Sequence, residues 1–166
     1  SKLRRNNEMK VEWFNHTGIV VQDMEKSLAF YKDLLGLEEE RNQVLEGELV
    51  DQLVGYKDSK LHVIYLSNGD MRHAIELVHY LNPVGEVMHT AERNTVGAIH
   101  IGVIVDDLDA FYEDMTGRGI KFVNKPFLRE NAEYPWARKA CYLQDPEGNW
   151  LEFIERPPAP PGVTAV

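Results

Sequence analysis

Two kinds of metal-ligating side chain occur twice in this sequence at matching places. His16 and His100 each open an apolar, β-branched stretch, and Glu76 and Glu152 each stand between large apolar residues. An ionised carboxylate is almost never fully buried without a partner, so both glutamates require an explanation. A salt bridge or a solvated strand face would explain one Glu, and a hydrogen-bonded core position would explain one His. Because both types recur together, a shared metal site is the stronger interpretation.

The chemistry of this set can be stated before any fold is assigned. Two neutral imidazoles and two carboxylates would balance the charge of one divalent ion, and mixed nitrogen and oxygen ligands suit zinc, nickel, cobalt, manganese or iron. The single cysteine, Cys141, can form neither a thiolate cluster nor an internal disulfide. Four protein ligands on an octahedral ion would leave two neighbouring positions for water or substrate. The sequence therefore predicts one divalent metal held by His16, Glu76, His100 and Glu152.

The elements that must position these residues are themselves written twice. The stretch HTGIVVQDM at 16–24 recurs as HIGVIVDDL at 100–108, and each copy is typical of a strand ending at an acidic turn. Asp23 and Asp107 are each placed to cap a helix, and Gly36 is placed to end the first one. Each copy therefore begins with a strand followed by a helix.

The back half of each copy consists of short strands. Apolar runs separated by turn residues predict two hairpins, 61–66 with 74–80 and 139–144 with 150–154. We therefore expect an α+β fold of two βαβββ modules, whose pseudo-two-fold packing would bring the two His and Glu pairs toward one axis. The predicted single domain spans 12–156, with an N-terminal arm at 1–11, module 1 at 12–81, module 2 at 97–156 and a flexible Pro-rich tail at 157–166.

Composition restricts the functional classes. A chain of 166 residues with 43% hydrophobic content is expected to form one compact domain. A formal charge of -9 argues against a nucleic-acid partner, because binding to phosphates requires a basic face. No apolar run approaches the length of a membrane span, and no signal segment opens the chain, so we expect a cytoplasmic protein that does not bind membranes.

The remaining histidines fit a metal site less well. His73 and His79 differ from Glu76 by an odd number of residues, so in a regular strand they lie on the opposite face. His62 and His89 have no counterpart in the other copy. The symmetric set is limited to the four residues named above.

Three motifs carry a resemblance to a known family. The segments HTGIVV at 16–21, FYKDLLGL at 30–37 and DPEGNWLE at 145–152 resemble the glyoxalase and bleomycin-resistance family of the vicinal oxygen chelate superfamily. The likeness covers about residues 12 to 156. It implies a curved, cup-shaped mixed sheet that holds one metal, with ligands on the first and last strands of each module. It also implies a homodimer, and it leaves open whether the cup is formed within one chain or across two.

The resemblance also implies a reaction. The His, Glu, His, Glu set is similar to that of glyoxalase I (lactoylglutathione lyase) and, with Gln in the second place, to that of methylmalonyl-CoA epimerase. Both are a lyase or isomerase that moves a proton next to a carbonyl, while the metal chelates two substrate oxygens and takes up the charge of an enediolate or enolate. By resemblance, Glu152 is the leading candidate for the base, and Glu76 would serve the other face.

Other members of the superfamily provide the alternatives. Extradiol dioxygenases use two His and one Glu on iron, but they carry a further His before the Asp-Pro-x-Gly turn, and the segment 134–139 contains none. A thiol transferase that opens an epoxide antibiotic stays possible. A metal-free binding protein of the bleomycin-resistance kind would have the same fold, although such proteins generally lack the ligand set.

The substrate is the least determined feature. Tyr134, Trp136 and Arg138 would form an apolar wall with a cation for an anionic group, or would instead pack the loop or a dimer. The segments 46–60 and 124–138 are expected to shape the pocket, while Trp150, like Tyr56 within the first of these segments, is expected in the core. Nothing in the sequence selects glutathione, CoA or a free small acid as the substrate, and the metal among the candidates stays equally open.

Overall fold

The computed structural model describes residues 11–70, 72–87, 92–128 and 139–158. The chain forms two compact units, residues 1–86 and 87–166. In the described part, no helix has the length and apolar character needed to cross a membrane.

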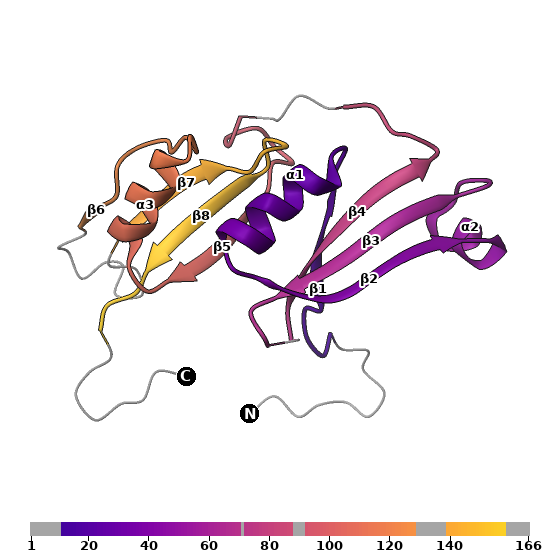
Figure 1. Ribbon diagram of the computed structural model, residues 1–166, viewed down its shortest axis with the longest axis horizontal. Coiled ribbons are helices and arrows are strands. Elements are labelled where there is room, and N and C mark those ends of the chain that lie inside the picture. Colours follow the sequence, from indigo (N-terminus) through magenta and orange to yellow (C-terminus); the bar gives the residue numbers. More distant parts are fainter. Residues whose placement is uncertain (1–10, 71, 88–91, 129–138, 159–166) are drawn as a thin grey trace. The chain divides into compact units, whose positions relative to one another are not determined.

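Unit 1 is a four-stranded mixed sheet with one covering helix. Its elements are β1 (His16–Val20), α1 (Met24–Leu28), the π-helical turn η1 (Ala29–Leu34), β2 (Glu38–Glu46), α2 (Glu48–Val54), β3 (Lys60–Ser67) and β4 (Ala74–Asn82) (Figure 1). The strand order is β1-β4-β3-β2, in which β1 and β4 are parallel and the other neighbours are antiparallel. The first and last strands of the module are therefore direct neighbours.

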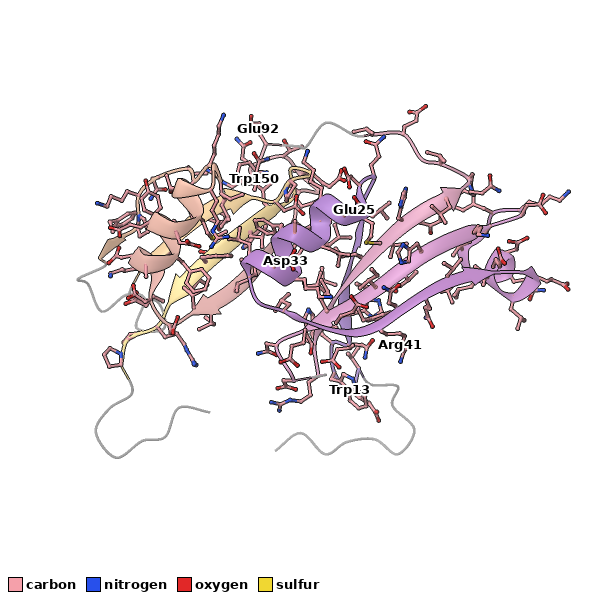
Figure 2. The ribbon with its side chains drawn as sticks, viewed as in Figure 1. Trp13, Glu25, Asp33, Arg41, Glu92 and Trp150 are labelled. Atoms are coloured by element: carbon pink, nitrogen blue, oxygen red, sulfur yellow. The ribbon has the colours of Figure 1, made fainter. Side chains whose placement is uncertain are left out.

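The helix of unit 1 begins as predicted but ends differently. The Asp23 carboxylate accepts a hydrogen bond from the Lys26 backbone N–H at 3.0 Å and caps α1. The last turn is a π-helix, in which the Leu35 N–H donates to the Phe30 carbonyl at 3.0 Å. This wider turn departs from the predicted regular α-helical spacing. Gly36, at φ +73°, follows the helix as expected. The outer surface of this helix carries exposed charged residues such as Glu25 and Asp33 (Figure 2).

The sheet of unit 1 has a buried face and a face that carries the polar side chains. Ile64, Leu66 and Leu77 are fully buried on one face, and α1 contacts β4. Successive residues of a strand point to opposite faces, so Tyr65 and Glu76, which are paired in the register of β3 and β4, share the other face. The candidate ligands of unit 1 lie on this second face.

Unit 2 repeats the arrangement. Its elements are β5 (His100–Val105), α3 (Leu108–Gly117), β6 (Phe127–Leu128), β7 (Lys139–Gln144) and β8 (Trp150–Glu155), in the order β5-β8-β7-β6. Asp107 caps α3 by accepting from the Ala110 N–H at 3.0 Å, which confirms the predicted cap. Phe153 on β8 packs edge-on against Phe111 of α3, with ring centroids 5.9 Å apart. The helix therefore covers the sheet face that does not carry Glu152.

Most of the predicted element order is confirmed, and two expectations fail. Both units have the order βαβββ, and helix α2 adds a short element within the segment 46–60. Tyr56 does not join the core: it follows α2 on the surface with an exposed fraction of 55%, and its ring meets that of Tyr80 edge-on. Trp150 is half-buried rather than a core residue. The residues Tyr134, Trp136 and Arg138 lie outside the described residues.

Candidate functional site

The first His and Glu pair is formed by two parallel neighbours, β1 and β4. Gly18 is opposite Glu76 in the register, and His16 stands two residues earlier on the same face of β1. Glycine has no side chain, so the Glu76 carboxylate can lie beside β1 next to the imidazole. The His16 Nε2 and Glu76 Oε2 atoms are 3.2 Å apart.

The second pair has the same construction in unit 2. Gly102 on β5 is opposite Glu152 on β8, and His100 again stands two residues before the glycine. The His100 Nε2 and Glu152 Oε2 atoms are 3.3 Å apart. In both pairs the carboxylate side chain is the more buried partner: its exposed fraction is 18% for Glu76 and 15% for Glu152, against 36% and 46% for the imidazoles. Each sheet therefore presents one open imidazole beside one sheltered carboxylate.

These two gaps have the dimensions of a ligand pair on one ion. Metal bonds of about 2.1 Å that meet at right angles place two ligand atoms about 3 Å apart, which is close to both measured separations. A proton on the imidazole would also fit between a His and a Glu at this distance. Both gaps thus have the size required for a shared cation, whether a metal ion or a proton.

A contact behind His16 favours the metal-binding form of its ring. The Nδ1 atom of His16 lies 2.7 Å from the Asn15 side-chain oxygen. An amide oxygen can only accept a hydrogen bond, so Nδ1 carries the hydrogen, and Nε2 is the ring nitrogen that faces Glu76. Metal-bound histidines are commonly oriented by such a partner on the second ring nitrogen. The donor set and its orientation therefore fit a divalent ion.

A tyrosine lies beside each pair, and neither tyrosine was predicted from the sequence. The Tyr65 hydroxyl donates to Glu76 Oε1 at 2.6 Å, which leaves Oε2 facing His16. Burial, and secondarily this hydrogen bond, raises the pKa of Tyr65 to about 12, so the phenol keeps its proton at neutral pH. Tyr142 is opposite Glu152 in the register of β7 and β8. Each tyrosine also meets its histidine edge-on, with ring centroids 5.6 Å apart in unit 1 and 5.2 Å in unit 2.

The two glycines differ in the space around them. A Cβ atom added at Gly18 would lie 3.1 Å from Glu76 Oε2, a tighter contact than side chains normally make. A Cβ atom added at Gly102 would meet nothing within 4 Å. The carboxylate of Glu152 therefore has room on the β5 side that Glu76 lacks on the β1 side.

Two of the other histidines that the structure describes contact polar side chains away from the two pairs. His62 contacts Asn42 through Nε2 at 2.8 Å, and the Nε2 atom of His73 lies 2.9 Å from the Thr17 hydroxyl. In the described ranges, no group of three or more His, Cys, Asp or Glu side chains is arranged to hold a metal. Each unit thus supplies one pair, and the meeting of both pairs at one ion stays a prediction.

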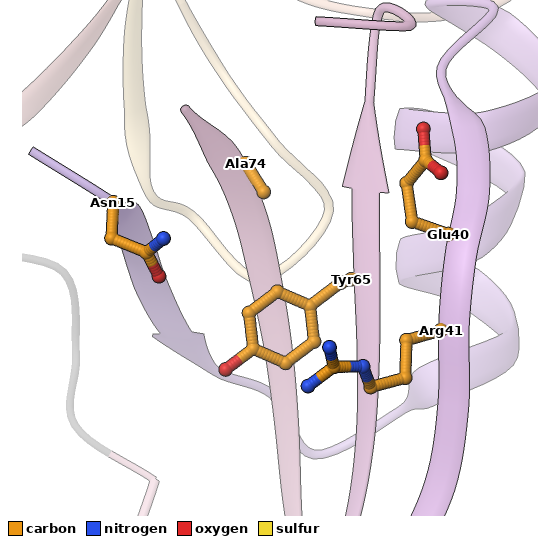
Figure 3. A pocket seen from close by; sticks show the side chains of 5 residues that line it. All are labelled: Asn15, Glu40, Arg41, Tyr65 and Ala74. Carbon is orange, nitrogen blue, oxygen red and sulfur yellow. The ribbon is translucent and has the colours of Figure 1, made fainter. Parts of the chain in front are cut away.

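A small pocket of about 120 Å³ lies beside the first pair. It is lined by Asn15, Glu40, Arg41, Tyr65 and Ala74 (Figure 3), and none of these belongs to the segment 46–60 that was expected to shape a pocket. The Arg41 guanidinium carbon lies 5.3 Å from the centroid of the Tyr65 ring.

Unit 2 has a similar cation on its own tyrosine. The Arg93 guanidinium carbon lies 5.0 Å from the ring centroid of Tyr142 and 4.8 Å from that of Trp150. Both arginines were missed from the sequence, because neither stands in a repeated position.

Comparison with known proteins gives one family. The sequence matches the family described as the Glyoxalase/Bleomycin resistance protein/Dioxygenase superfamily over residues 13–153. It is 26% identical over 144 residues to the uncharacterized protein YwbC of Bacillus subtilis, covering 86% of this chain and 96% of that protein.

Other relatives, which the chain covers less completely, have named activities. The chain is 27% identical over 112 residues to the mitochondrial methylmalonyl-CoA epimerase of Homo sapiens, covering 67% of this chain and 56% of the epimerase. It is 26% identical over 147 residues to a lactoylglutathione lyase of Schizosaccharomyces pombe, covering 86% of this chain and 45% of the lyase.

A solved structure has the same fold. A glyoxalase family protein from Bacillus cereus superposes with a TM-score of 0.79 at 22% identity, covering 91% of this chain and 98% of that one.

Proposed function

We propose that this chain is a divalent-metal-dependent enzyme of the glyoxalase type, since it belongs to the Glyoxalase/Bleomycin resistance protein/Dioxygenase superfamily. The reaction would be that of a lyase or isomerase, in which a proton moves beside a substrate carbonyl. The observation that carries this proposal is the duplicated pair, with imidazole and carboxylate 3.2 Å apart in one unit and 3.3 Å apart in the other.

The ligands in this proposal are His16, Glu76, His100 and Glu152. When bound, a divalent ion such as zinc, nickel, cobalt, manganese or iron would supply a Lewis acid for two vicinal substrate oxygens. The protein contributes orientation: Asn15 fixes the ring of His16, and the hydroxyl of Tyr65 holds one oxygen of Glu76.

Glu152 is the proposed base. A carboxylate that takes a proton from the substrate must be able to leave its resting position, and the open space beside Gly102 gives Glu152 that freedom. Glu76 is held by the Tyr65 hydroxyl, and its carboxylate occupies the space beside Gly18 that a side chain would need. These contacts support an anchoring ligand in unit 1 and a mobile carboxylate in unit 2.

A methylmalonyl-CoA epimerase-like isomerase is the close alternative, because the same proton movement serves both reactions and relatives of both kinds match the chain. Exchange of the substrate α-proton in heavy water, measured by NMR across hemithioacetals and acyl-CoA esters, would separate them. Exchange with hemithioacetals is expected for the glyoxalase-type reaction. Oxygen consumption with catechols, and no exchange, would overturn the proposal in favour of a dioxygenase.

Metal content provides the direct test. Wild-type protein is expected to bind about one divalent ion per set of four ligands, and His100→Ala and Glu152→Gln are expected to lower the affinity for it. His62→Ala is the matched control, because this histidine contacts Asn42 and is no proposed ligand. A wild-type protein that binds a small molecule without any divalent metal would favour a binding protein over an enzyme.

We further propose that the protein is a homodimer. Mixing two inactive variants tests whether each site is formed by the two modules of one chain or by modules from both chains. His16→Ala and His100→Ala are each expected to be inactive. If module 1 of one chain and module 2 of its partner form the site, a mixture regains about a quarter of wild-type activity, because a mixed dimer keeps one intact site. If both modules of one chain form it, the mixture stays inactive.

A further inference from the structure

Strand β2 contains one extra residue opposite the site. The register of β2 and β3 pairs Glu39 with Leu66 and then Arg41 with Tyr65, so Glu40 is left over as a β-bulge. Such an insertion changes the direction of the side chains that follow it, and bulges are frequent beside active sites.

The bulge decides which charge reaches the site. In an uninterrupted register Glu40 would be opposite Tyr65, and Arg41 would be opposite Ile64, which is fully buried on the other face. With the bulge, Arg41 joins the cross-strand row that contains Tyr65 and Glu76. A cation therefore takes a place that regular pairing would give to a carboxylate.

The guanidinium of Arg41 is held in place but keeps its hydrogen-bonding capacity. It lies over the Tyr65 ring, and Figure 3 shows the side chain reaching from β2 toward that ring. Among the residues that the structure describes, no carboxylate lies within ion-pairing distance of it. Glu40, its neighbour in the pocket, instead accepts a hydrogen bond from the Ser67 hydroxyl at 2.5 Å. The planar edge of a stacked guanidinium matches the two oxygens of a carboxylate.

We propose that the pocket formed by Asn15, Arg41 and Tyr65 binds a carboxylate of the substrate. This inference rests on the proposed function, in which the vicinal oxygens of the substrate would bind the ion held by His16, Glu76, His100 and Glu152. The pocket volume of about 120 Å³ corresponds to a few water molecules, which is enough for a carboxylate and a short carbon chain. The substrate class is thus a small acid whose anionic group lies a few bonds from its chelating oxygens.

The charges of the pocket make this binding dependent on the metal. Glu40 and Glu76 together carry more negative charge than Arg41 offsets, so the metal-free pocket repels an anion. A bound divalent ion, whose charge Glu76 and Glu152 balance together, cancels this excess of negative charge. Anion binding is therefore expected only after metal loading.

Two hydroxamates that differ at one end test the subsite. Succinohydroxamate and butyrohydroxamate both chelate through vicinal oxygens, but only the first carries a carboxylate. Calorimetric titration of zinc- or nickel-loaded protein should give about tenfold tighter binding of succinohydroxamate, the effect of one charge-assisted contact. Arg41→Gln should remove this preference and leave the affinity for butyrohydroxamate unchanged, while Arg41→Lys should keep part of the preference. The control is Arg118→Gln, because Arg118 pairs with Asp114 on α3.

The outcomes separate the subsite from the reaction centre. Equal affinity of the wild-type protein for the two hydroxamates would overturn the subsite alone and leave the metal centre intact. No binding of either hydroxamate to the metal-loaded protein would overturn the chelating function and the subsite with it. A preference that persists in Arg41→Gln would also overturn the role of Arg41.

Discussion

The two units present the same residues in the same register but surround them differently. In each, a glycine, a glutamate and a tyrosine stand side by side on three neighbouring strands, and a histidine precedes the glycine by two residues. In unit 1 the Glu76 carboxylate occupies the space beside Gly18, whereas in unit 2 the space beside Gly102 is open. The repeat thus fixes which residue types form each pair, and the two carboxylates differ in the space beside them.

The cations next to the tyrosines differ in origin. Arg41 comes from the bulged strand β2 of unit 1, while Arg93 lies in the segment before β5 of unit 2 and stacks on both Tyr142 and Trp150. Similar contacts are therefore made by non-equivalent parts of the two modules. Outside the repeated His, Gly, Glu and Tyr positions the two modules differ, and we expect substrate selection to depend on these differing segments.

The largest expected difference between the units concerns proton transfer. Glu152→Gln should lower the rate of α-proton exchange by about 10²- to 10⁴-fold, because an amide cannot accept the proton. Glu76→Gln should have a smaller effect on this rate at saturating metal, because Glu76 acts as an anchor. NMR exchange rates of the metal-saturated variants give the comparison. An equal loss of exchange rate in both variants would show that the two carboxylates contribute equally to proton transfer.

The next effect concerns the tyrosine that holds Glu76. Tyr65→Phe removes the 2.6 Å hydrogen bond and should weaken metal binding by about 10-fold, as is typical when a group that orients a ligand is lost. Competition with a chelating dye measures the affinity. The control is Tyr56→Phe, an exposed tyrosine that follows α2. Unchanged affinity in Tyr65→Phe would mean that Glu76 needs no support from β3.

A smaller effect should distinguish the two glycines. Gly18→Ala places a methyl group 3.1 Å from Glu76 Oε2, so the carboxylate must shift by a few tenths of an ångström. We expect a severalfold loss of metal affinity, whereas Gly102→Ala, with nothing within 4 Å, should leave the affinity unchanged. The same dye competition measures both variants. Equal effects would contradict the unequal freedom of the two carboxylates.

The fold and the two His and Glu pairs were accessible from the sequence because repetition marks them. A His at the start of one strand and a Glu within another recur with the whole strand and helix pattern, so chance is a poor explanation. Tyr65 and Tyr142 also occupy matching places, but a tyrosine in an apolar strand is common and carries no such signal. Arg41 could not be predicted from the sequence for a different reason. The face on which it lies depends on a β-bulge, and one extra residue moves the side chains that follow it to the opposite face.

The last comparison concerns the reactivity of the single cysteine thiol, which lies on the buried face of unit 2. Cys141 is 2% exposed and is paired with Phe153 in the register, and burial raises its pKa to about 12 from 9.0. At pH 8 the thiolate fraction is therefore about a thousandfold lower than in an ordinary cysteine, and native protein should not react with iodoacetamide within hours. Mass spectrometry of native and urea-unfolded samples gives the rates.

The thiol also makes the comparison of the two units measurable. Because Cys141 belongs to unit 2, its alkylation reports the opening of that unit and says nothing of unit 1. If metal bridges the two His and Glu pairs, then zinc or nickel should slow the alkylation in intermediate urea, since an ion bound to the folded form stabilises both units together. His16→Ala, a change confined to unit 1, should abolish this protection. Protection that survives in His16→Ala would instead mean that unit 2 binds the metal without help from unit 1.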